Sequence, residues 1–261
     1  MTLLLHEIRQ NRLALMIWSA AISFMMAVCV IIYPEMSSQM GDISEMFADM
    51  GAFTSAFGMD QLNFGEFMGY FGIECGNVLG LGGAIFAAIL GASAISREEK
   101  DKTAEFLLTH PISRERILKE KLLAIFSQVA ILNAAVIAIS SLDILAVGVE
   151  AEWGTLMLVF LAYFMLQIEI AAITFGVSAF MKRGSLGVGL GIVFGMYFIN
   201  ILANLTEEIS ALKYITPFGY ADGAHIIPEG SIEIKYLAVG TLLAILGIAA
   251  AFLKYRKKDI T

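Results

Sequence analysis

Charged residues are scarce in this chain, and their scarcity decides its class. Only 16% of the 261 residues are charged, while 58% are hydrophobic and the mean hydropathy is +0.78. Soluble globular domains contain about 25% charged residues, so the composition excludes that class and indicates an integral membrane protein. The apolar runs reach about twenty residues, which is the length of a membrane-spanning helix and roughly twice that of a barrel strand. We therefore predict an all-α membrane fold.

Cysteine, histidine and catalytic motifs are scarce as well. Cys29 and Cys75 match neither a disulfide framework nor a C-x-x-C metal site, and His6, His110 and His225 are scattered. The sequence contains no G-x-x-x-x-G-K-[ST] phosphate-binding loop and neither an H-E-x-x-H nor a G-x-S-x-G motif. We therefore expect no catalytic residue, no metal site and no nucleotide site within this chain.

Six apolar segments have the length that a transmembrane helix requires. They are residues 13–33, 70–95, 122–147, 154–181, 185–205 and 232–253. We treat residues 1–261 as one transmembrane domain. With the N-terminus inside, 15 of the 17 Lys and Arg residues fall on the inner side, and only Lys213 and Lys235 fall outside. Inner loops carry the excess of positive charge, so we predict a multi-pass protein of the plasma (inner) membrane with both termini cytoplasmic.

Two segments outside the spans have an amphipathic pattern. Residues 2–12 suit a short amphipathic helix on the inner membrane surface, although a plain extension of the first span explains the pattern equally well. In the outer loop, residues 34–69, one helical face is apolar and predicts an external helix. That face consists of Ile43, Met46, Phe47 and Met50. The last outer loop, residues 206–231, contains prolines and glycines that predict turns and short helices.

Methionine is abundant in the loop of residues 34–69. Thioether clusters bind Cu(I), which makes a copper-related role one interpretation. No His or Cys accompanies these methionines, so we favour the interpretation that they form an apolar helix face or an adaptable binding surface.

The charged loop between the second and third spans, residues 96–121, holds seven of the 17 Lys and Arg residues. Thr103 can cap a short helix, and Pro111 ends it, because a proline disfavours helical backbone at the preceding residue. The apolar residues of this helix are Phe106, Leu107 and Leu108. An apolar patch among charges normally meets a partner. Ser113 can cap a second helix that continues into the third span.

This loop resembles that of the permeases of ABC-2 type transporters. The matching residues are Glu98, Glu99, Thr103, Leu107, Leu108, the turn Pro111-Ile112-Ser113-Arg114 and Lys121. Two further stretches are similar to that family, namely Thr216-Pro217-Phe218 before the last span and residues 255–260 at the end. With the six-span layout, the resemblance extends over essentially the whole chain.

The resemblance implies a half-transporter of the exporter type, whose residues 103–110 form a coupling helix that docks on a separate cytoplasmic ABC ATPase. The N-terminal surface helix would touch the same ATPase. The implied contact residues are Glu98, Glu99, Thr103, Phe106, Leu107, Leu108, Pro111 and Arg114. ATP and Mg would be bound by the partner, so this chain would hold no cofactor. A second permease copy or a related permease would complete the complex in membrane lipid, and no nucleic acid is expected.

Substrate and function class stay open at this point. The Met- and Phe-rich outer surface with few polar groups favours outward movement of an amphipathic or hydrophobic compound, a peptide or a lipid. One alternative is an ABC exporter of ions, sodium or copper-related. The other is a membrane scaffold or sensor that recruits a soluble partner without transporting anything.

Small residues recur at every fourth position in two spans. They are Gly72, Gly76 and Gly80 in the second span, continued by Ala84, Ala88 and Ala92, and Gly187, Gly191 and Gly195 in the fifth. Such faces let helices approach closely in lipid, both within a subunit and between subunits. We favour tight packing within one subunit over a sliding seam between two.

Polar side chains within the spans are few, which makes each a candidate for the transport pathway. Glu169 lies near the middle of the fourth span, where an ionisable group costs about 2.5–3.5 kcal/mol on insertion scales and needs a partner or water. It could meet a cationic substrate or a proton, or it could clip helices together through Asn200 or a tyrosine. Gln167 points to another side of the same helix. Glu169, Gln167 and Asn200 are therefore the candidate pathway residues.

Overall fold

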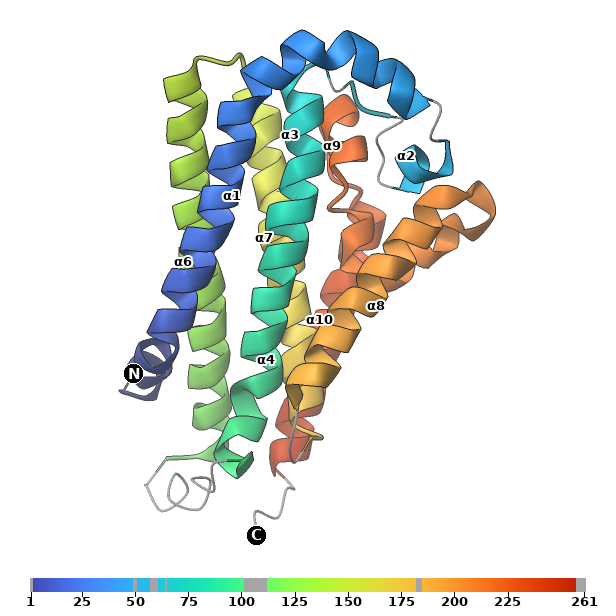
Figure 1. Cartoon of the computed structure of the whole chain (residues 1–261). Helices are drawn as coiled ribbons and strands as arrows, with labels where there is room; N and C mark the ends of the chain where they lie inside the picture. Colours follow the sequence, from blue (N-terminus) through green and yellow to red (C-terminus); the bar gives the residue numbers. More distant parts are fainter. Residues whose placement is uncertain are drawn as a thin grey trace.

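Long helices make up most of the computed structural model (Figure 1), which describes residues 2–48, 51–56, 61–63, 65–100, 112–181 and 185–256. Within this described part, six segments are long and apolar enough to cross a membrane. They are Leu3–Ser37, Phe67–Arg97, Arg114–Val147, Trp153–Ser178, Leu186–Leu205 and Ile234–Arg256. The predicted all-α membrane fold with six spans is confirmed.

The elements follow one another along the chain as a sequence of helices. The α-helices are α1 (Thr2–Ala48), α2 (Ala52–Ala56), α3 (Phe67–Cys75), α4 (Gly82–Lys100), α6 (Arg114–Val147), α7 (Trp153–Ser178), α8 (Ser185–Leu205), α9 (Gly223–Glu229) and α10 (Ile234–Arg256). A π-helix, η1 (Gly76–Leu81), joins α3 to α4, and two 3-10 helices, η2 (Glu207–Ile215) and η3 (Pro217–Gly219), follow α8.

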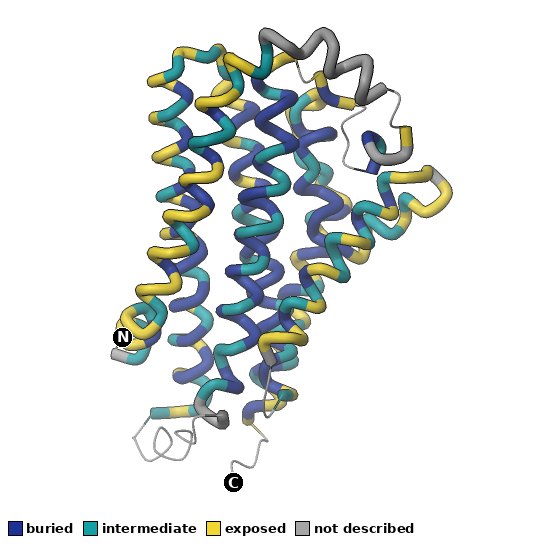
Figure 2. The backbone as a smooth tube through the Cα atoms, in the orientation of Figure 1, coloured by how far each residue is buried: buried dark blue, intermediate teal, exposed yellow. Residues whose placement is uncertain are grey.

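The core of the bundle lies along the second and fourth spans. Burial covers 72% of the most apolar window of Phe67–Arg97 and 61% of that of Trp153–Ser178, but only 17% of that of Leu186–Leu205. Figure 2 shows the same contrast as dark central tubes beside the lighter tube of α8. α4 packs against α7 and α8, α10 packs against α7, and α1 packs against α6. α4 and α7 are therefore the helices through which the others are connected.

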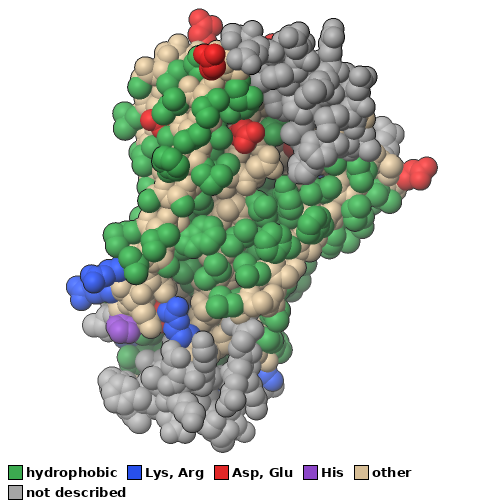
Figure 3. Space-filling view, viewed as in Figure 1, with side chains coloured by type: hydrophobic (Ala, Val, Ile, Leu, Met, Phe, Trp, Pro, Cys, Tyr) green, Lys and Arg blue, Asp and Glu red, His purple; other side chains and the backbone are tan. Residues whose placement is uncertain are grey.

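The outer surface of the bundle suits a lipid environment. Large apolar side chains such as Ile17, Phe24, Leu142 and Phe198 are more than half exposed, at 57%, 69%, 65% and 60%. Figure 3 shows hydrophobic side chains across the middle of one face, with Lys and Arg toward the end that holds the chain termini and Asp and Glu toward the opposite end. We call these the termini end and the opposite end.

The first helix extends beyond the first span at both ends. α1 begins at Thr2 and continues through Pro34 to Ala48, so residues 2–12 and the described part of the predicted external helix, residues 43–48, are helical and continuous with the first span. Both interpretations of residues 2–12 include this helical backbone. Beyond the first span α1 turns across the opposite end of the bundle (Figure 1), because a proline removes a helical hydrogen bond and bends the helix.

The second span contains a feature that its sequence pattern did not predict. The backbone of Gly76–Leu81 forms one stretch of π-helix between α3 and α4. A π-turn widens the helix and leaves a carbonyl group available to other donors, and such turns often lie at functional sites. Here the widened turn faces α7, with consequences for the polar contacts described below.

The loop before the last span folds back into the bundle. Thr216 caps η3 by accepting from the Phe218 amide at 3.2 Å, and Asp222 caps α9 by accepting from the Ala224 amide at 3.0 Å. Tyr220, between the two helices, is only 1% exposed. Non-helical backbone at membrane depth is tolerated where protein surrounds it, and here α3, α7, α8 and α10 do so. The predicted turns and short helices are confirmed.

Candidate functional site

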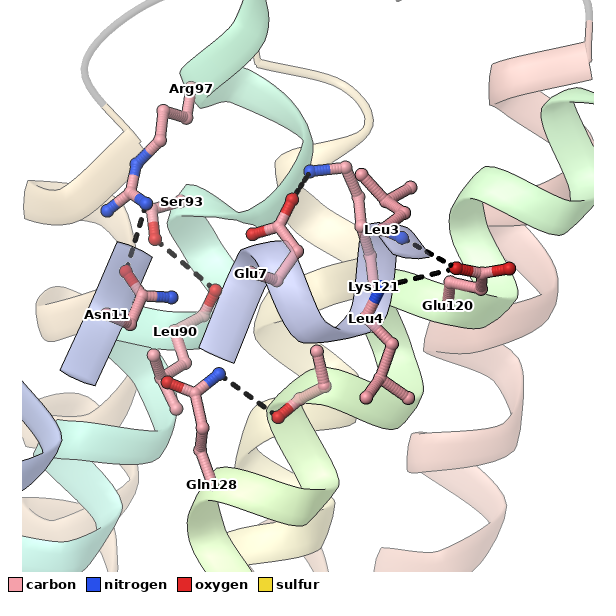
Figure 4. Close-up of polar contacts among 11 residues, drawn as sticks. Leu3, Leu4, Glu7, Asn11, Leu90, Ser93, Arg97, Glu120, Lys121 and Gln128 are labelled. Carbon is pink, nitrogen blue, oxygen red and sulfur yellow. Dashed lines mark hydrogen bonds and ion pairs between the residues drawn. The ribbon is translucent and has the colours of Figure 1, made fainter. Parts of the chain in front are cut away.

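A buried ion pair joins the first turns of α1 to the start of α6 at the termini end (Figure 4). Lys121 Nζ donates to Glu7 Oε1 at 2.6 Å, and the two side chains are 3% and 11% exposed. Moving two charges out of water is costly, and only a close, well-oriented partner offsets that cost. Each side chain therefore depends on the other, and the pair ties α1 to α6.

A second carboxylate on α6 holds the beginning of α1. Glu120 Oε2 accepts hydrogen bonds from the backbone amides of Leu3 and Leu4 at 3.1 and 3.2 Å. The first four amides of a helix have no partner within the helix, and a negative charge there also interacts favourably with the helix dipole. Arg116 Nε lies 2.9 Å from Glu120 Oε1 and orients the carboxylate from the next turn. The start of α1 is therefore capped by α6.

The same stretch of α1 is also bound to the end of α4. Arg97 Nη1 donates to Asn11 Oδ1 at 3.0 Å, one helical turn beyond Glu7 (Figure 4). α4 ends at Lys100 and α6 begins at Arg114, so the two helices flank the middle of the charged loop. α1 thus contacts both flanks of that loop through polar side chains.

The C-terminal helix is fastened to the start of α6 as well. Arg114 Nη1 donates to the backbone carbonyls of Tyr255 and Arg256 at 3.1 and 3.3 Å, and Glu115 forms an ion pair with Arg256. The last carbonyls of a helix lack partners within the helix and favour a positive charge. The first two turns of α6 therefore hold both the start of α1 and the end of α10, and we call this arrangement the α6 junction.

Most of the predicted coupling residues cannot be compared with this geometry. Thr103, Phe106, Leu107, Leu108 and Pro111 lie outside the described residues, and Glu98 and Glu99 belong to α4 but their side chains are not described. Arg114, predicted as part of the polar flank, is bound to the end of α10. Ser113 caps α6 as predicted, accepting from the Arg116 amide at 3.3 Å.

Sequence reasoning missed the side chains that build the α6 junction. The sequence identifies Lys121 only as the last residue of the ABC-2-like motif, and Glu7 falls within the amphipathic segment of residues 2–12 without being singled out. Their partner positions are 114 residues apart. The one available signal was the presence of opposite charges at the edges of two neighbouring spans, which does not specify a pair.

In the bundle interior, Glu169 of α7 accepts two hydrogen bonds from hydroxyl groups. Tyr220 donates to Oε2 at 3.0 Å and Thr241 of α10 donates to Oε1 at 2.9 Å. The carboxylate lies against Gly240, where an added Cβ would collide with it. Asn200, the predicted amide partner, is not among these contacts. This geometry favours the helix-clip interpretation, with Tyr220 and Thr241 as the partners of Glu169.

Gln167, on another side of α7, joins three helical segments. Its Oε1 accepts from Asn133 Nδ2 of α6 at 2.6 Å, and its Nε2 donates to the Leu79 carbonyl of the π-helix at 3.2 Å. The side chain lies against Gly83, where an added Cβ would collide with the amide. Gln167 therefore uses a carbonyl of the widened turn η1 and connects the second, third and fourth spans.

The two predicted glycine faces meet different surroundings. An added Cβ would collide with Ile227 at Gly72, would lie 2.9 Å from the Tyr163 hydroxyl at Gly76, and would lie 2.8 Å from the Tyr163 ring at Gly80. The second-span face is thus packed against α9 and α7 of the same chain. In α8, by contrast, no described atom other than the neighbouring residues and the nearby helix backbone lies within 4 Å of an added Cβ at Gly187, Gly191 or Gly195.

A polar cavity of about 60 Å³ lies between η1, α7, α8 and the loop that folds back into the bundle. Asn200 is one of its walls and is 9% exposed. Tyr197 donates to Asn77 Oδ1 at 3.2 Å across the cavity wall, and Asn204 Nδ2 lies 3.4 Å from Asp222 Oδ2. Burial raises the pKa of the Asp222 carboxyl above its usual range, and the charge of Lys213 opposes this rise.

These features define a class and then a family. Six apolar helices with polar contacts inside the bundle make the chain a multi-pass, all-α membrane protein. A family model described as ABC-2 family transporter protein matches residues 1–259, so the chain belongs to that family and is a membrane permease component of an ABC transporter. No curated protein matches the chain.

Proposed function

We propose that the chain is the permease subunit of an ATP-driven exporter and that ATP hydrolysis takes place in a separate cytoplasmic ABC ATPase. The proposal is supported by membership of the ABC-2 family and by a sequence without a phosphate-binding loop. The ATPase would contact residues 96–121. The chain would lie in the plasma membrane, with its termini end facing the cytoplasm. The inner excess of Lys and Arg supports this orientation.

The observation that carries the proposal is the α6 junction. The charged loop is flanked by α4 and α6, and both flanks are bound to α1 through Asn11 and Glu7. The start of α6 also holds the end of α10 through Arg114. A push on the loop would therefore move α1, α4, α6 and α10 together, because a buried ion pair connects α1 to α6 and hydrogen bonds connect α4 to α1 and α10 to α6. A loop that served only to connect two spans would not need to be held to both terminal helices.

The substrate we propose is an amphipathic or hydrophobic compound, a peptide or a lipid, moved outward with a second permease copy or a related permease. The α8 face around Gly191 has no neighbour in the described chain, which leaves it open to lipid or to that second permease. The ion-exporter alternative receives less support, because both oxygens of Glu169 are already occupied by hydroxyl donors.

The substitution Leu107→Asp tests the coupling-loop assignment. The experiment is purification of the tagged chain from its native membrane, with the co-purified ABC ATPase quantified. Because an apolar contact surface does not accept a buried charge, we expect Leu107→Asp to lower the recovered ATPase at least about tenfold while the chain still inserts. Ile209→Asp, at an exposed apolar position at the opposite end, is the matched control and should leave recovery unchanged. Equal recovery with Leu107→Asp would contradict the assignment.

A further inference from the structure

The polar cavity beside α8 is built from side chains that the ATPase-coupling argument does not use. Its volume is about 60 Å³, roughly four times the space that one water molecule needs. The polar side chains that line it are Asn77, Tyr163, Tyr197, Asn200, Asn204 and Asp222. Ile73, Ile201 and Phe218 form apolar walls beside them. The cavity lining therefore contains both polar and apolar side chains, which suits the polar end of an amphipathic molecule.

Two acceptor atoms of side chains in the cavity lining lack a short hydrogen bond. Asn200 Oδ1 is buried and has no hydrogen-bond partner in the described part of the chain. Asp222 Oδ2 has only the long contact to Asn204 Nδ2, at 3.4 Å. Buried polar atoms are nearly always paired, so an unpaired acceptor on a side chain that lines a cavity is available to a donor bound there after a rotation of the amide.

The charged side chains in the cavity lining are of one sign, although Lys213 and His225, outside the lining, also act on Asp222. Asp222 is the one carboxylate among the described residues that line it, and no Lys, Arg or His side chain is among them. A carboxylate in such a place is stabilised by a cation that can also donate hydrogen bonds. A primary ammonium group meets both needs, because it carries one positive charge and three donors and no acceptor.

We propose that this cavity binds the primary ammonium group of an amphipathic amine, with Asp222 as counter-ion and Asn200 Oδ1 as a hydrogen-bond acceptor. The apolar part of the molecule packs against Ile201 and Phe218. A metal ion is the weaker candidate, because the described residues contain no group of three His, Cys, Asp or Glu side chains that could hold one. The inference rests on the proposed export function, because it names the chemical class of the exported compound.

Binding of octylammonium to the purified full-length permease in lipid nanodiscs tests the proposal by isothermal titration calorimetry. Empty nanodiscs provide the reference for partition into lipid. Octanol and octyltrimethylammonium are the comparison ligands, because the first lacks the charge and the second lacks the donors. We expect octylammonium to bind at least about tenfold more tightly than either, since a charged hydrogen bond contributes about that factor or more.

Two variants locate the binding. Asp222→Asn keeps the size of the side chain and the cap on α9, since asparagine caps helices as well as aspartate does, and should weaken octylammonium binding about tenfold or more. Asn200→Leu fills the cavity and removes the acceptor, so it should weaken binding by a similar factor. Asp143→Asn, on α6 and away from the cavity, is the matched control and should bind as the wild type does. If Asp222→Asn does not fold, octylammonium binding by Asn200→Leu tests the proposal.

Three results would each overturn the proposal. They are unchanged octylammonium binding in these variants, binding of octanol as tight as that of octylammonium, and a calorimetric signal from sodium chloride alone that both variants abolish. The proposed export function is tested separately, by ATP-driven transport in vesicles that contain permease and ATPase. Transport of other compounds without octylammonium binding would overturn only the amine site. Octylammonium binding by a chain that supports no ATP-driven transport would overturn only the export function.

Discussion

Glu7 and Glu169 are both buried carboxylates in long helices, but the protein satisfies them in different ways. Glu7 is paired with the ammonium group of Lys121 at the termini end. Glu169 has no cation beside it among the described contacts and accepts from the hydroxyls of Tyr220 and Thr241. Loss of one member of a buried charge pair is strongly destabilising, whereas hydrogen bonds from hydroxyl groups are weaker and change partner more easily.

The difference matches the positions of the two residues. The α6 junction flanks the loop that we propose receives the push of the ATPase, so a rigid connection suits it. The Glu169 contacts join α7 to α10 and to the loop that folds back into the bundle, and the helices of the exporter that we propose would have to move relative to one another. Hydroxyl donors can change partner without leaving a lone charge behind. We therefore infer a rigid connection at the termini end and an exchangeable contact in the middle of the bundle.

Removal of one member of the ion pair should have the largest effect. Lys121→Met leaves the Glu7 carboxylate buried without a cation, which costs about 3–5 kcal/mol, and thermal unfolding of the purified protein would show a large drop in its midpoint. The double variant Glu7→Gln with Lys121→Met removes both charges and should recover most of the loss.

The matched control for this pair is Lys119→Met, two residues away on α6 at an exposed position, which should unfold at nearly the wild-type temperature. If Lys121→Met were no less stable than Lys119→Met, the ion pair would not hold the α6 junction together. If the double variant stayed as unstable as Lys121→Met, the loss would come from packing around the lysine chain instead.

The Glu169 contact should respond less, and differently to two substitutions. Glu169→Leu leaves the buried Tyr220 hydroxyl without its acceptor, at a cost of about 1–3 kcal/mol, whereas Glu169→Gln keeps a carbonyl acceptor and should cost less than about 1 kcal/mol. Thermal unfolding measures both. Transport measured in vesicles separates the roles, since a helix clip predicts normal transport by Glu169→Gln. Loss of transport by a stable Glu169→Gln protein would instead favour a direct role with a cation or a proton.

The spans and the helix caps could be predicted because their signals are local. An apolar run of sufficient length identifies a spanning helix, and Ser113 is followed directly by the helix that it caps. The π-helix was missed because the apolar pattern of the second span is continuous through Gly76–Leu81. The single long α1 was left open because residues 2–12 fit a surface helix and an extension of the span equally well.

The contacts of the candidate sites could not be predicted because they join distant parts of the chain. A tyrosine was one of the two partners considered for Glu169, yet Tyr220 is 51 residues away in a loop whose path the sequence does not specify. Glycines with identical spacing also have different surroundings. An added Cβ at Gly76 would approach the Tyr163 hydroxyl, whereas one at Gly191 would point into open space. Spacing identifies a smooth helix face, but the arrangement of the other helices decides what that face meets.

The smallest effect should come from a third carboxylate, that of Glu115, because it is partly exposed to water. Glu115 pairs with Arg256 at the α6 junction, but the two side chains are 43% and 57% exposed. Exposed ion pairs contribute about 0–1 kcal/mol and are screened by salt. Glu115→Gln should therefore shift the unfolding midpoint only slightly, and less again in high salt, since Arg114 still holds the end of α10. A double-mutant cycle with Arg256→Gln measures the pair itself, and a coupling as large as that of Glu7 with Lys121 would mean that burial does not decide the strength of these contacts.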